Sequence, residues 1–197
     1  MLTPLLNPIL GVCLFSYLLG SIPFALIVSR AKGVDLRKVG SGNLGATNVY
    51  RAMGLGYALL VFGLDAIKGY IPVMIALNHF ESPWVHILIG FCAIVGHSLS
   101  PFVKFKGGKG AATGLGVLLA ISPDVCGLVF AVALILILAF RYVAPVTILC
   151  SVLTPILLWA FGYAQEYVAF VTLICLFIIY RHRSNIVRLF QGKENRI

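Results

Sequence analysis

The positively charged residues of this chain lie in every second gap between long apolar segments. Of the fifteen Lys and Arg residues, only Lys68 lies in the middle of such a segment, and Lys109 lies at the very start of another. A helix needs roughly 20 apolar residues to cross ~30 Å of hydrocarbon, and seven segments come near this length. They are residues 5–29, 55–78, 83–100, 108–121, 124–140, 143–161 and 164–180. The sequence therefore predicts an all-α polytopic membrane protein, a bundle of seven transmembrane helices.

The composition excludes an ordinary soluble protein. The chain has 197 residues, of which 60% are hydrophobic and 11% are charged, whereas soluble domains average about 25% charged residues. In a soluble protein a net charge of +9 would suggest a nucleic-acid partner. Here the positive-inside rule accounts for most of the charge, so we expect no nucleic acid. We interpret residues 1–197 as a single integral-membrane domain.

The basic gaps also predict the orientation of the chain. Lys and Arg lie in residues 30–53, in residues 101–110, at Arg141 and in the tail 181–197. Because positive residues stay in the cytoplasm, we expect the N-terminus outside and the C-terminus inside. Segment 108–121 is short, but without it Arg141 and the basic tail would lie outside, so we expect it to cross. No Lys or Arg precedes the first segment, so we expect no cleaved signal peptide.

The first polar stretch on the predicted cytoplasmic side is GSGNLGATNVYR, residues 40–51. Glycine lets the backbone approach a ligand closely, and successive amides in such a turn can form an anion-binding nest. Thr47 or Asn48 is expected to cap the following helix, and Arg51 offers a planar cation suited to phosphate. Taken alone, the stretch can equally be read as an ordinary linker between two spans.

The second polar stretch is FVKFKGGKGAATG, residues 102–114. It is not a Walker A sequence, because position 103 is Val and Lys109 is followed by Gly110, whereas that motif needs Gly and then Ser or Thr there. Nucleotide hydrolysis is therefore not implied. A glycine turn with Lys109 at a helix start can still cradle a phosphate-like anion. The alternative is a set of lysines that only obey the topology rule.

The third polar stretch is RHRSNIVRLFQGKE, residues 181–194. His182, Asn185 and Arg188 recur every three residues, so a helix would place them on one side. The alternative is a basic anchor that binds acidic lipid headgroups.

Asp65 and Lys68 lie near the middle of the second apolar segment. Charges inside a membrane are costly and usually paired, and we interpret these two as a structural ion pair. His86 is interpreted as structural, and His97 as a brace for the Lys109 loop. The five cysteines all lie in apolar segments, so we assign them no disulfide or metal role. With six acidic residues and no metal-ligand spacing, we expect neither a metal nor a cofactor.

Together the three stretches resemble the signature motifs of the bacterial acyl-phosphate:glycerol-3-phosphate acyltransferases, the PlsY family. GSGNLGATNVYR, GHSLSPFVKFKGGKGAATG and RSNIVRLFQGKE match in order and spacing through the whole chain. The resemblance implies transfer of a fatty acyl group from acyl phosphate to the 1-hydroxyl of glycerol 3-phosphate. The products would be lysophosphatidic acid and phosphate, in phospholipid biosynthesis. It also implies the bacterial cytoplasmic (inner) membrane, with the active site facing the cytoplasm.

The resemblance, together with the chemistry of the three stretches, gives the expected residue roles. The expected catalytic residues are Ser41, Arg51, Lys109, His182 and Asn185. The expected substrate-binding residues are Gly40, Asn43, Thr47, Asn48, Lys106, Gly107, Gly108, Gly110 and Arg188. His97 and Glu194 are expected to give structural support. The expected partners are glycerol 3-phosphate, acyl phosphate and membrane lipids, with transient contact to the enzyme that makes acyl phosphate.

Two phosphorylated reactants call for two anion sites, and this chain offers cations and glycine turns for them. Acyl phosphate already carries a good leaving group, so direct attack by the glycerol hydroxyl needs no metal and no activated nucleophile. We expect the three stretches to form one shared pocket. The donor phosphate or His182 would accept the proton, and the sequence leaves both open. The competing interpretations are an anion transporter and a non-catalytic scaffold for acidic lipids or a soluble enzyme.

Overall fold

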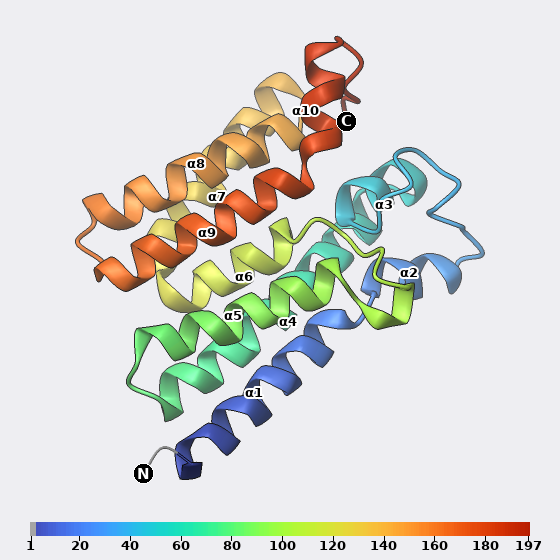
Figure 1. Ribbon diagram of the computed structural model, residues 1–197. Coiled ribbons are helices and arrows are strands. Elements are labelled where there is room, and N and C mark those ends of the chain that lie inside the picture. Colours follow the sequence, from blue (N-terminus) through green and yellow to red (C-terminus); the bar gives the residue numbers. More distant parts are fainter. Residues whose placement is uncertain (1–2) are drawn as a thin grey trace. The chain divides into compact units, whose positions relative to one another are not determined.

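The computed structural model describes the backbone of residues 3–197 and the side chains of residues 8–197. No strand occurs in this part of the chain, and its regular secondary structure is entirely helical (Figure 1). The prediction of an all-α protein is confirmed. The helices are α1 (Thr3–Ser21), α2 (Phe24–Arg30), α3 (Ala46–Met53), α4 (Leu55–His79), α5 (Pro83–Ser98), the 3-10 helix η1 (Pro101–Val103), α6 (Ala111–Ile121), α7 (Pro123–Phe140), α8 (Ala144–Ala160), α9 (Gln165–Arg181) and α10 (Arg183–Phe190).

Each of the seven predicted apolar segments contains at least one helix. Among the described residues, four stretches are long and apolar enough to cross a membrane, and α9 with α10, bent by 56°, gives a fifth if the pair is one span. These four are Pro8–Arg30, Leu55–His79, Pro83–Val103 and Pro123–Phe140. Helices α6 and α8 are apolar but shorter. The seven crossings and the orientation therefore stay predictions.

Helix α6 differs most from its predicted segment. It has 11 residues, which at ~1.5 Å per residue span roughly half of the hydrocarbon. It begins only at Ala111 because Gly110 has φ +88°, a left-handed conformation that does not continue a right-handed helix. Residues 108–110 of the predicted segment therefore belong to the preceding loop.

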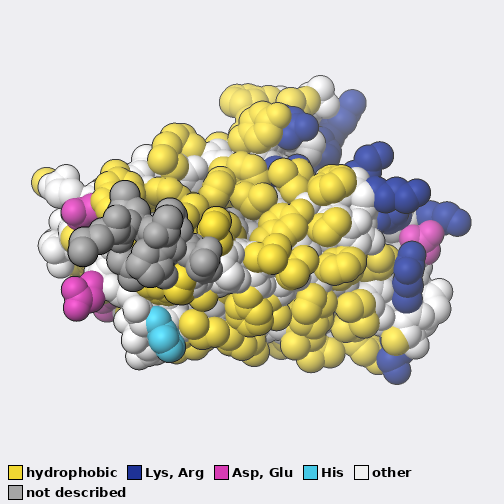
Figure 2. Space-filling view, turned by 60° about the horizontal axis from the view of Figure 1, so that its bottom comes forward, with side chains coloured by type: hydrophobic (Ala, Val, Ile, Leu, Met, Phe, Trp, Pro, Cys, Tyr) yellow, Lys and Arg dark blue, Asp and Glu magenta, His cyan; other side chains and the backbone are white. Residues whose placement is uncertain are grey.

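The chain forms two compact units, Met1–Ala120 and Ile121–Ile197. In the first unit α1 packs against α5 and α4, and both α2 and α3 pack against α4. In the second unit α8 packs between α7 and α9, and α10 contacts α8 and α9. That these units act as a single domain stays a prediction. Hydrophobic side chains cover much of the face shown in Figure 2, as an apolar solvent requires.

The first predicted span is broken between α1 and α2 at Pro23, which has no amide hydrogen to donate. Two backbone carbonyl groups at the break accept hydrogen bonds from buried side chains. Ser100 Oγ donates to Ser21 O at 2.6 Å, and Lys68 Nζ donates to Ile22 O at 2.9 Å. Buried polar groups from α4 and from the end of α5 therefore hold the break in place.

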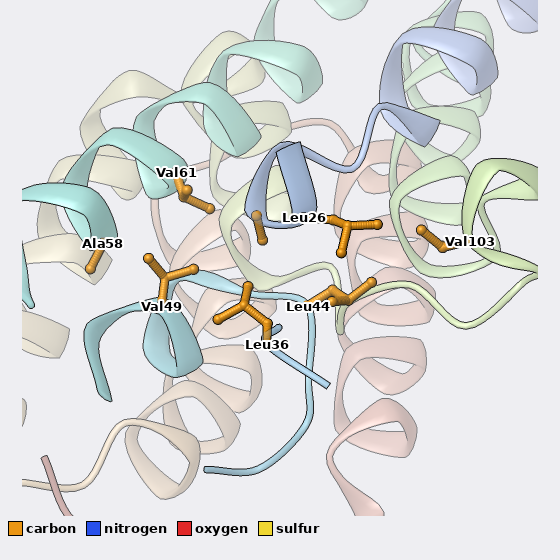
Figure 3. Close-up of a cluster of buried hydrophobic side chains, with 8 residues drawn as sticks. Leu26, Leu36, Leu44, Val49, Ala58, Val61 and Val103 are labelled. Carbon is orange, nitrogen blue, oxygen red and sulfur yellow. The ribbon is translucent and has the colours of Figure 1, made fainter. Parts of the chain in front are cut away.

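A hydrophobic cluster anchors the segment between α2 and α4 (Figure 3). Leu36 and Leu44 project from this segment and are 0% and 4% exposed. They meet Val49 of α3, Leu26 of α2 and Val61 of α4 in the cluster. Because burial of a Leu side chain contributes roughly 1.5–3 kcal/mol, the cluster fixes the glycine-rich stretch between its two leucines.

Candidate active site

Asn48 organises the loop of the first polar stretch. Its side chain is almost fully buried, and its Oδ1 accepts bonds from Ser41 N at 2.9 Å and from Ser41 Oγ at 3.3 Å. Its Nδ2 donates to Leu36 O at 3.0 Å. One buried amide therefore ties the exposed Ser41 to α3 and to the anchored part of the loop. Since the Asn48 amide contacts the loop itself, we interpret it as a positioning group.

The glycines of this loop are needed for space as well as for conformation. Gly40 has φ +58°, and a Cβ there would overlap Asn48 Oδ1 and lie 3.6 Å from Arg51 Cδ. The Asn48 amide and the Arg51 side chain therefore pass close to the Gly40 backbone. The loop places Asn43 N 3.5 Å from Ser41 Oγ, and Arg51 lies against the neighbouring Gly40.

The predicted helix cap in this stretch is wrong. Helix α3 begins at Ala46 and its N-terminal cap is Gly45, which has no side chain to donate or accept a bond. Thr47 and Asn48 lie inside the first turn, where Asn48 N donates to Gly45 O at 3.0 Å. The Asn48 side chain reaches back to Ser41 instead, because the loop before α3 folds over the helix start.

The second polar stretch forms a tight loop between η1 and α6. Phe105 N donates to Ser100 O at 2.8 Å, and Gly107 N donates to Ser98 O at 3.1 Å. Lys104 and Phe105 both have positive φ, +55° and +59°. The chain thus reverses after η1 and runs back along the end of α5, and it then reaches the half-buried Lys109 just before α6.

His97 at the end of α5 lies directly against this loop. A Cβ on Gly107 would overlap His97 O, and a Cβ on Gly108 would overlap His97 Nε2. The same Gly108 Cβ would lie 2.8 Å from Leu44 O of the first stretch. The two glycine-rich loops therefore meet at Gly108. They can do so because Gly108 has no side chain.

A buried polar cluster lies behind His97. Asp65 Oδ1 is 2.7 Å from Lys68 Nζ and 3.6 Å from His97 Nδ1. Lys68 also lies 5.5 Å from the Phe24 ring centroid, within cation–π range. The predicted ion pair of Asp65 and Lys68 is therefore present. A cavity of about 10 Å³, room for about one water molecule, is bordered by these residues and by Gly107 and Gly108.

In the second unit, Glu194 holds the residues of the third polar stretch. Asn185 Nδ2 donates to Glu194 Oε1 at 2.7 Å, and Arg188 Nε donates to Glu194 Oε2 at 3.0 Å. The Glu194 side chain is only 3% exposed. Asn185 and Arg188 lie on one side of α10, as their spacing predicts. His182 precedes α10, and its Nδ1 lies 2.8 Å from Ile178 O.

The tail that carries Glu194 is tied to the turn between α7 and α8. Ile197 N donates to Arg141 O at 2.9 Å, and Arg141 Nε donates to Ile197 O at 3.0 Å. Arg196 Nε donates to the Tyr142 hydroxyl at 3.0 Å and lies over its ring. These contacts fasten the tail just beyond its carboxylate-bearing residue.

The structure thus groups the predicted site residues in two sets. In the first unit the loops of Ser41 and Lys109 meet, with Gly40, Asn43, Thr47, Arg51 and Lys106 on the same two segments. In the second unit Asn185 and Arg188 meet at Glu194, beside His182. One pocket shared by all three stretches stays a prediction. So do the catalytic, binding and supporting roles.

Sequence reasoning missed the approach of Asp65 to His97 and the tie of Arg141 to the tail. Asp65 and His97 are on different helices, 32 residues apart in the sequence, so no spacing pattern could have indicated the contact. The Asp65 carboxylate approaches the imidazole from α4.

The apolar helices indicate an integral membrane protein. Its two polar loops in the first unit pack against each other at glycine residues. Residues 10–192 match the family model described as glycerol-3-phosphate acyltransferase, and the chain belongs to this family. It is 47% identical to the glycerol-3-phosphate acyltransferase of Aquifex aeolicus over 93% of this chain and 96% of the relative. The relative from Thermus thermophilus is 44% identical over 93% and 92% of the two chains.

Two solved structures have the same fold. They are crystal structures of PlsY, an integral membrane glycerol 3-phosphate acyltransferase. Its glycerol 3-phosphate form matches with a TM-score of 0.93 and 46% identity, over 96% of both chains. Its lysophosphatidic acid form matches with a TM-score of 0.91 and 44% identity, over 96% of this chain and 95% of the other.

Proposed function

We propose that this protein transfers a fatty acyl group from acyl phosphate to the 1-hydroxyl of glycerol 3-phosphate. The products are lysophosphatidic acid and inorganic phosphate. The observation that carries the proposal is the meeting of two glycine-rich loops at Gly108, each with a cation, Arg51 or Lys109, on its segment. The glycerol 3-phosphate and lysophosphatidic acid forms of the similar PlsY support the acceptor and the product.

The acyl-phosphate end of the site is the loop Gly107–Gly110. Lys109 lies two residues before the start of α6, whose first amides have no partner within the helix and attract an anion. Gly108 allows the loop to pack against His97, and Gly110 allows the left-handed turn before α6, so that together they present this stretch of backbone to the donor phosphate. Lys106 adds positive charge at the exposed rim of this loop.

The glycerol 3-phosphate end of the site is the loop Gly40–Arg51. Ser41, Asn43 and Thr47 supply neutral hydrogen-bonding groups, and the Arg51 guanidinium pairs with the phosphate. In the second unit Asn185 and Arg188 serve the same substrates. Glu194 holds both in place and offsets part of the Arg188 charge.

The reaction is a direct acyl transfer. The 1-hydroxyl oxygen of glycerol 3-phosphate attacks the acyl carbonyl carbon, and the bond from that carbon to the phosphate oxygen breaks. Lys109, Arg51 and backbone amides stabilise charge that develops at the carbonyl and the phosphates, and Ser41 and Asn185 orient the hydroxyl. The proton goes to the leaving phosphate or to His182. No step requires a metal ion.

The geometry of His182 is compatible with transfer of the hydroxyl proton to its imidazole. Its Nδ1 lies 2.8 Å from the Ile178 carbonyl oxygen, which can only accept a hydrogen bond. The neutral ring therefore carries its proton on Nδ1, and Nε2 is its basic nitrogen. The pH–rate profile of His182→Gln separates the two routes. An unchanged profile with a small loss of rate assigns the proton to the phosphate, and loss of the acidic limb assigns it to His182.

The test of the proposed function is an assay of purified protein with acyl phosphate and labelled glycerol 3-phosphate, in the presence of a chelator. Acyl carrier protein and coenzyme A thioesters serve as alternative donors. We expect lysophosphatidic acid from acyl phosphate alone, and a loss of most turnover in Lys109→Ala. Turnover with a thioester donor only, or dependence on added metal, would contradict the proposal. Phosphate flux in liposomes without acyl transfer would instead support a transporter.

We further propose seven crossings, with the N-terminus outside and the site facing the cytoplasm of a bacterial inner membrane. There the enzyme that makes acyl phosphate can deliver its product by transient contact. Single cysteines at Arg37, Lys104 and Lys193, in a variant without the natural cysteines, can be labelled with an impermeant thiol reagent. All three should react only from the cytoplasmic side. Labelling of one of them from the outside overturns the orientation.

A further inference from the structure

The buried polar cluster next to His97 contains more than an ion pair, because His97 approaches the same carboxylate as Lys68. Asp65 lies near the middle of α4 and its side chain is 2% exposed, as is that of Lys68. A buried ion pair by itself contributes little to stability, because desolvation offsets the attraction. This pair has a further contact, since the same Asp65 oxygen that meets Lys68 lies 3.6 Å from His97 Nδ1.

A continuous series of contacts joins the middle of α4 to the acyl-phosphate loop. The His97 backbone carbonyl lies against Gly107 and its Nε2 lies against Gly108, each so close that a Cβ would overlap. The Asp65 carboxylate favours a proton on Nδ1 of the imidazole. The charge of Asp65, 3.6 Å from Nδ1, therefore favours one tautomer of the ring that lies against Gly108.

Lys68 holds the same carboxylate oxygen of Asp65. It donates to Ile22 O at the break between α1 and α2, so the position of the Asp65 oxygens is held to two helices. Ser100, which follows α5, donates to the neighbouring carbonyl of Ser21. The helix break and the start of the loop-bearing segment are thus held by the same group of buried contacts.

We propose that Asp65 is a positioning residue for acyl transfer, acting through His97 on the Gly107–Gly110 loop. It sets the loop for the phosphate of the acyl donor and does not touch either substrate. This inference rests on the proposed function, in which that loop binds acyl phosphate. A purely structural ion pair would support folding but would not change the binding of one substrate more than that of the other, so the two roles of Asp65 can be told apart.

The test compares steady-state kinetics of three variants with those of the wild type. Asp65→Asn with Lys68→Gln removes both charges together, so no unpaired charge is left in the interior, and Gln keeps a donor for Ile22 O. His97→Gln removes the imidazole, and the third variant combines all three changes. His86→Gln is the matched control, because His86 is a buried histidine of the same helix, about three turns before His97, and its Nε2 lies 2.6 Å from Phe80 O.

We expect the uncharged pair to raise KM for acyl phosphate about tenfold, with KM for glycerol 3-phosphate changed less than about twofold. The combined variant should be no worse than His97→Gln, because Asp65 acts through His97. The His86→Gln control should keep both KM values. Equal changes in both KM values, an unchanged KM for acyl phosphate, or multiplied losses in the combined variant would overturn the inference.

Hydrogen exchange of residues 104–112 gives a measurement that does not depend on activity. The amides of Phe105 and Gly107 are bonded to Ser100 O and Ser98 O and should exchange faster in the uncharged-pair variant, while α1 is unchanged. If wild type lacks acyl-phosphate activity but exchange responds in this way, the proposed function fails and the positioning stands. If wild type is active and exchange does not respond, the positioning fails and the function stands.

Discussion

The loops of the first unit and the α10 segment of the second unit hold their polar residues in different ways. At Gly107 and Gly108 the loop is fitted against His97 with no room for a methyl group. At Asn185 and Arg188 the side chains converge on one carboxylate, and the tail that carries it is fastened by exposed contacts. The first arrangement depends on the absence of side-chain atoms at Gly107 and Gly108, and the second depends on the negative charge of Glu194.

This difference teaches which changes each region tolerates. Close packing of backbone on backbone responds to added volume, because neither partner can move without shifting a helix. An ionic contact on a tail responds to lost charge, because the tail can move and accommodate volume. We therefore expect added atoms to be most damaging in the first unit, and removed carboxylate oxygens to be most damaging in the second.

The largest effect is expected for Gly107→Ala. Its Cβ would overlap His97 O, so the loop must shift by about 1 Å, which can reduce a rate by about 100-fold. The measurement is kcat/KM for acyl transfer together with the melting temperature. Gly63→Ala in α4 is the control, since nothing lies within 4 Å of the added atom. A Gly107→Ala enzyme with normal kcat/KM would show that the loop is not closely fitted.

The next effect is expected for Glu194→Ala. It removes the acceptor of Asn185 and Arg188, and a buried hydrogen-bonding group left without a partner costs about 1–3 kcal/mol. We expect acyl transfer to fall about 10- to 100-fold. Glu194→Gln keeps one acceptor and should lose less. Equal losses in the two variants would mean that the carboxylate charge, and not the contact to Asn185, is what the segment needs.

A smaller effect is expected for Asn48→Ala. The variant loses the bonds to Ser41 N and Leu36 O but leaves the anchors Leu36 and Leu44 in place, so the loop loosens without detaching. We expect a loss of about 1–2 kcal/mol in unfolding free energy and a higher KM for glycerol 3-phosphate. Asn78→Ala is the control, because that amide also donates to a carbonyl, Met74 O, but is exposed.

The sequence predicts features that depend on local composition, and it misses features that depend on contacts between distant residues. The apolar length of α4, residues 55–79, was predicted to within one residue, because hydrocarbon thickness sets it. The break at Pro23 and the late start of α6 were missed, because they depend on buried partners and on the φ of Gly110. The glycines pointed to close backbone approaches, and His97 was interpreted as a brace for the Lys109 loop, against which it lies. The approach of Asp65 to His97 was missed. The tie of residue 197 to Arg141 leaves no pattern in the sequence at all.

The smallest effect is expected for Tyr163→Phe. This variant tests whether Glu194 matters because its carboxylate is buried, or whether any carboxylate contact in the second unit would matter as much. Tyr163 donates a side-chain hydrogen bond to the Asp124 carboxylate at the start of α7, as Asn185 does to Glu194, but this contact is exposed. Desolvation and this hydrogen bond raise the pKa of Tyr163 from 10.0 to about 12. A raised pKa means that the neutral hydroxyl is favoured on folding, so its contribution is complete below pH 10 and lost as the pH rises toward about 12.

We therefore expect Tyr163→Phe to keep wild-type acyl transfer at neutral pH and to melt only slightly below the wild type. That difference in melting temperature should close between pH 10 and about 12, because wild type loses the hydrogen bond there and the variant has none to lose. Thermal unfolding in detergent at several pH values measures it. A loss of activity as large as that of Glu194→Gln would mean that any carboxylate contact in the second unit matters, buried or not. The contrast between fitted loops and a buried charge would then no longer hold.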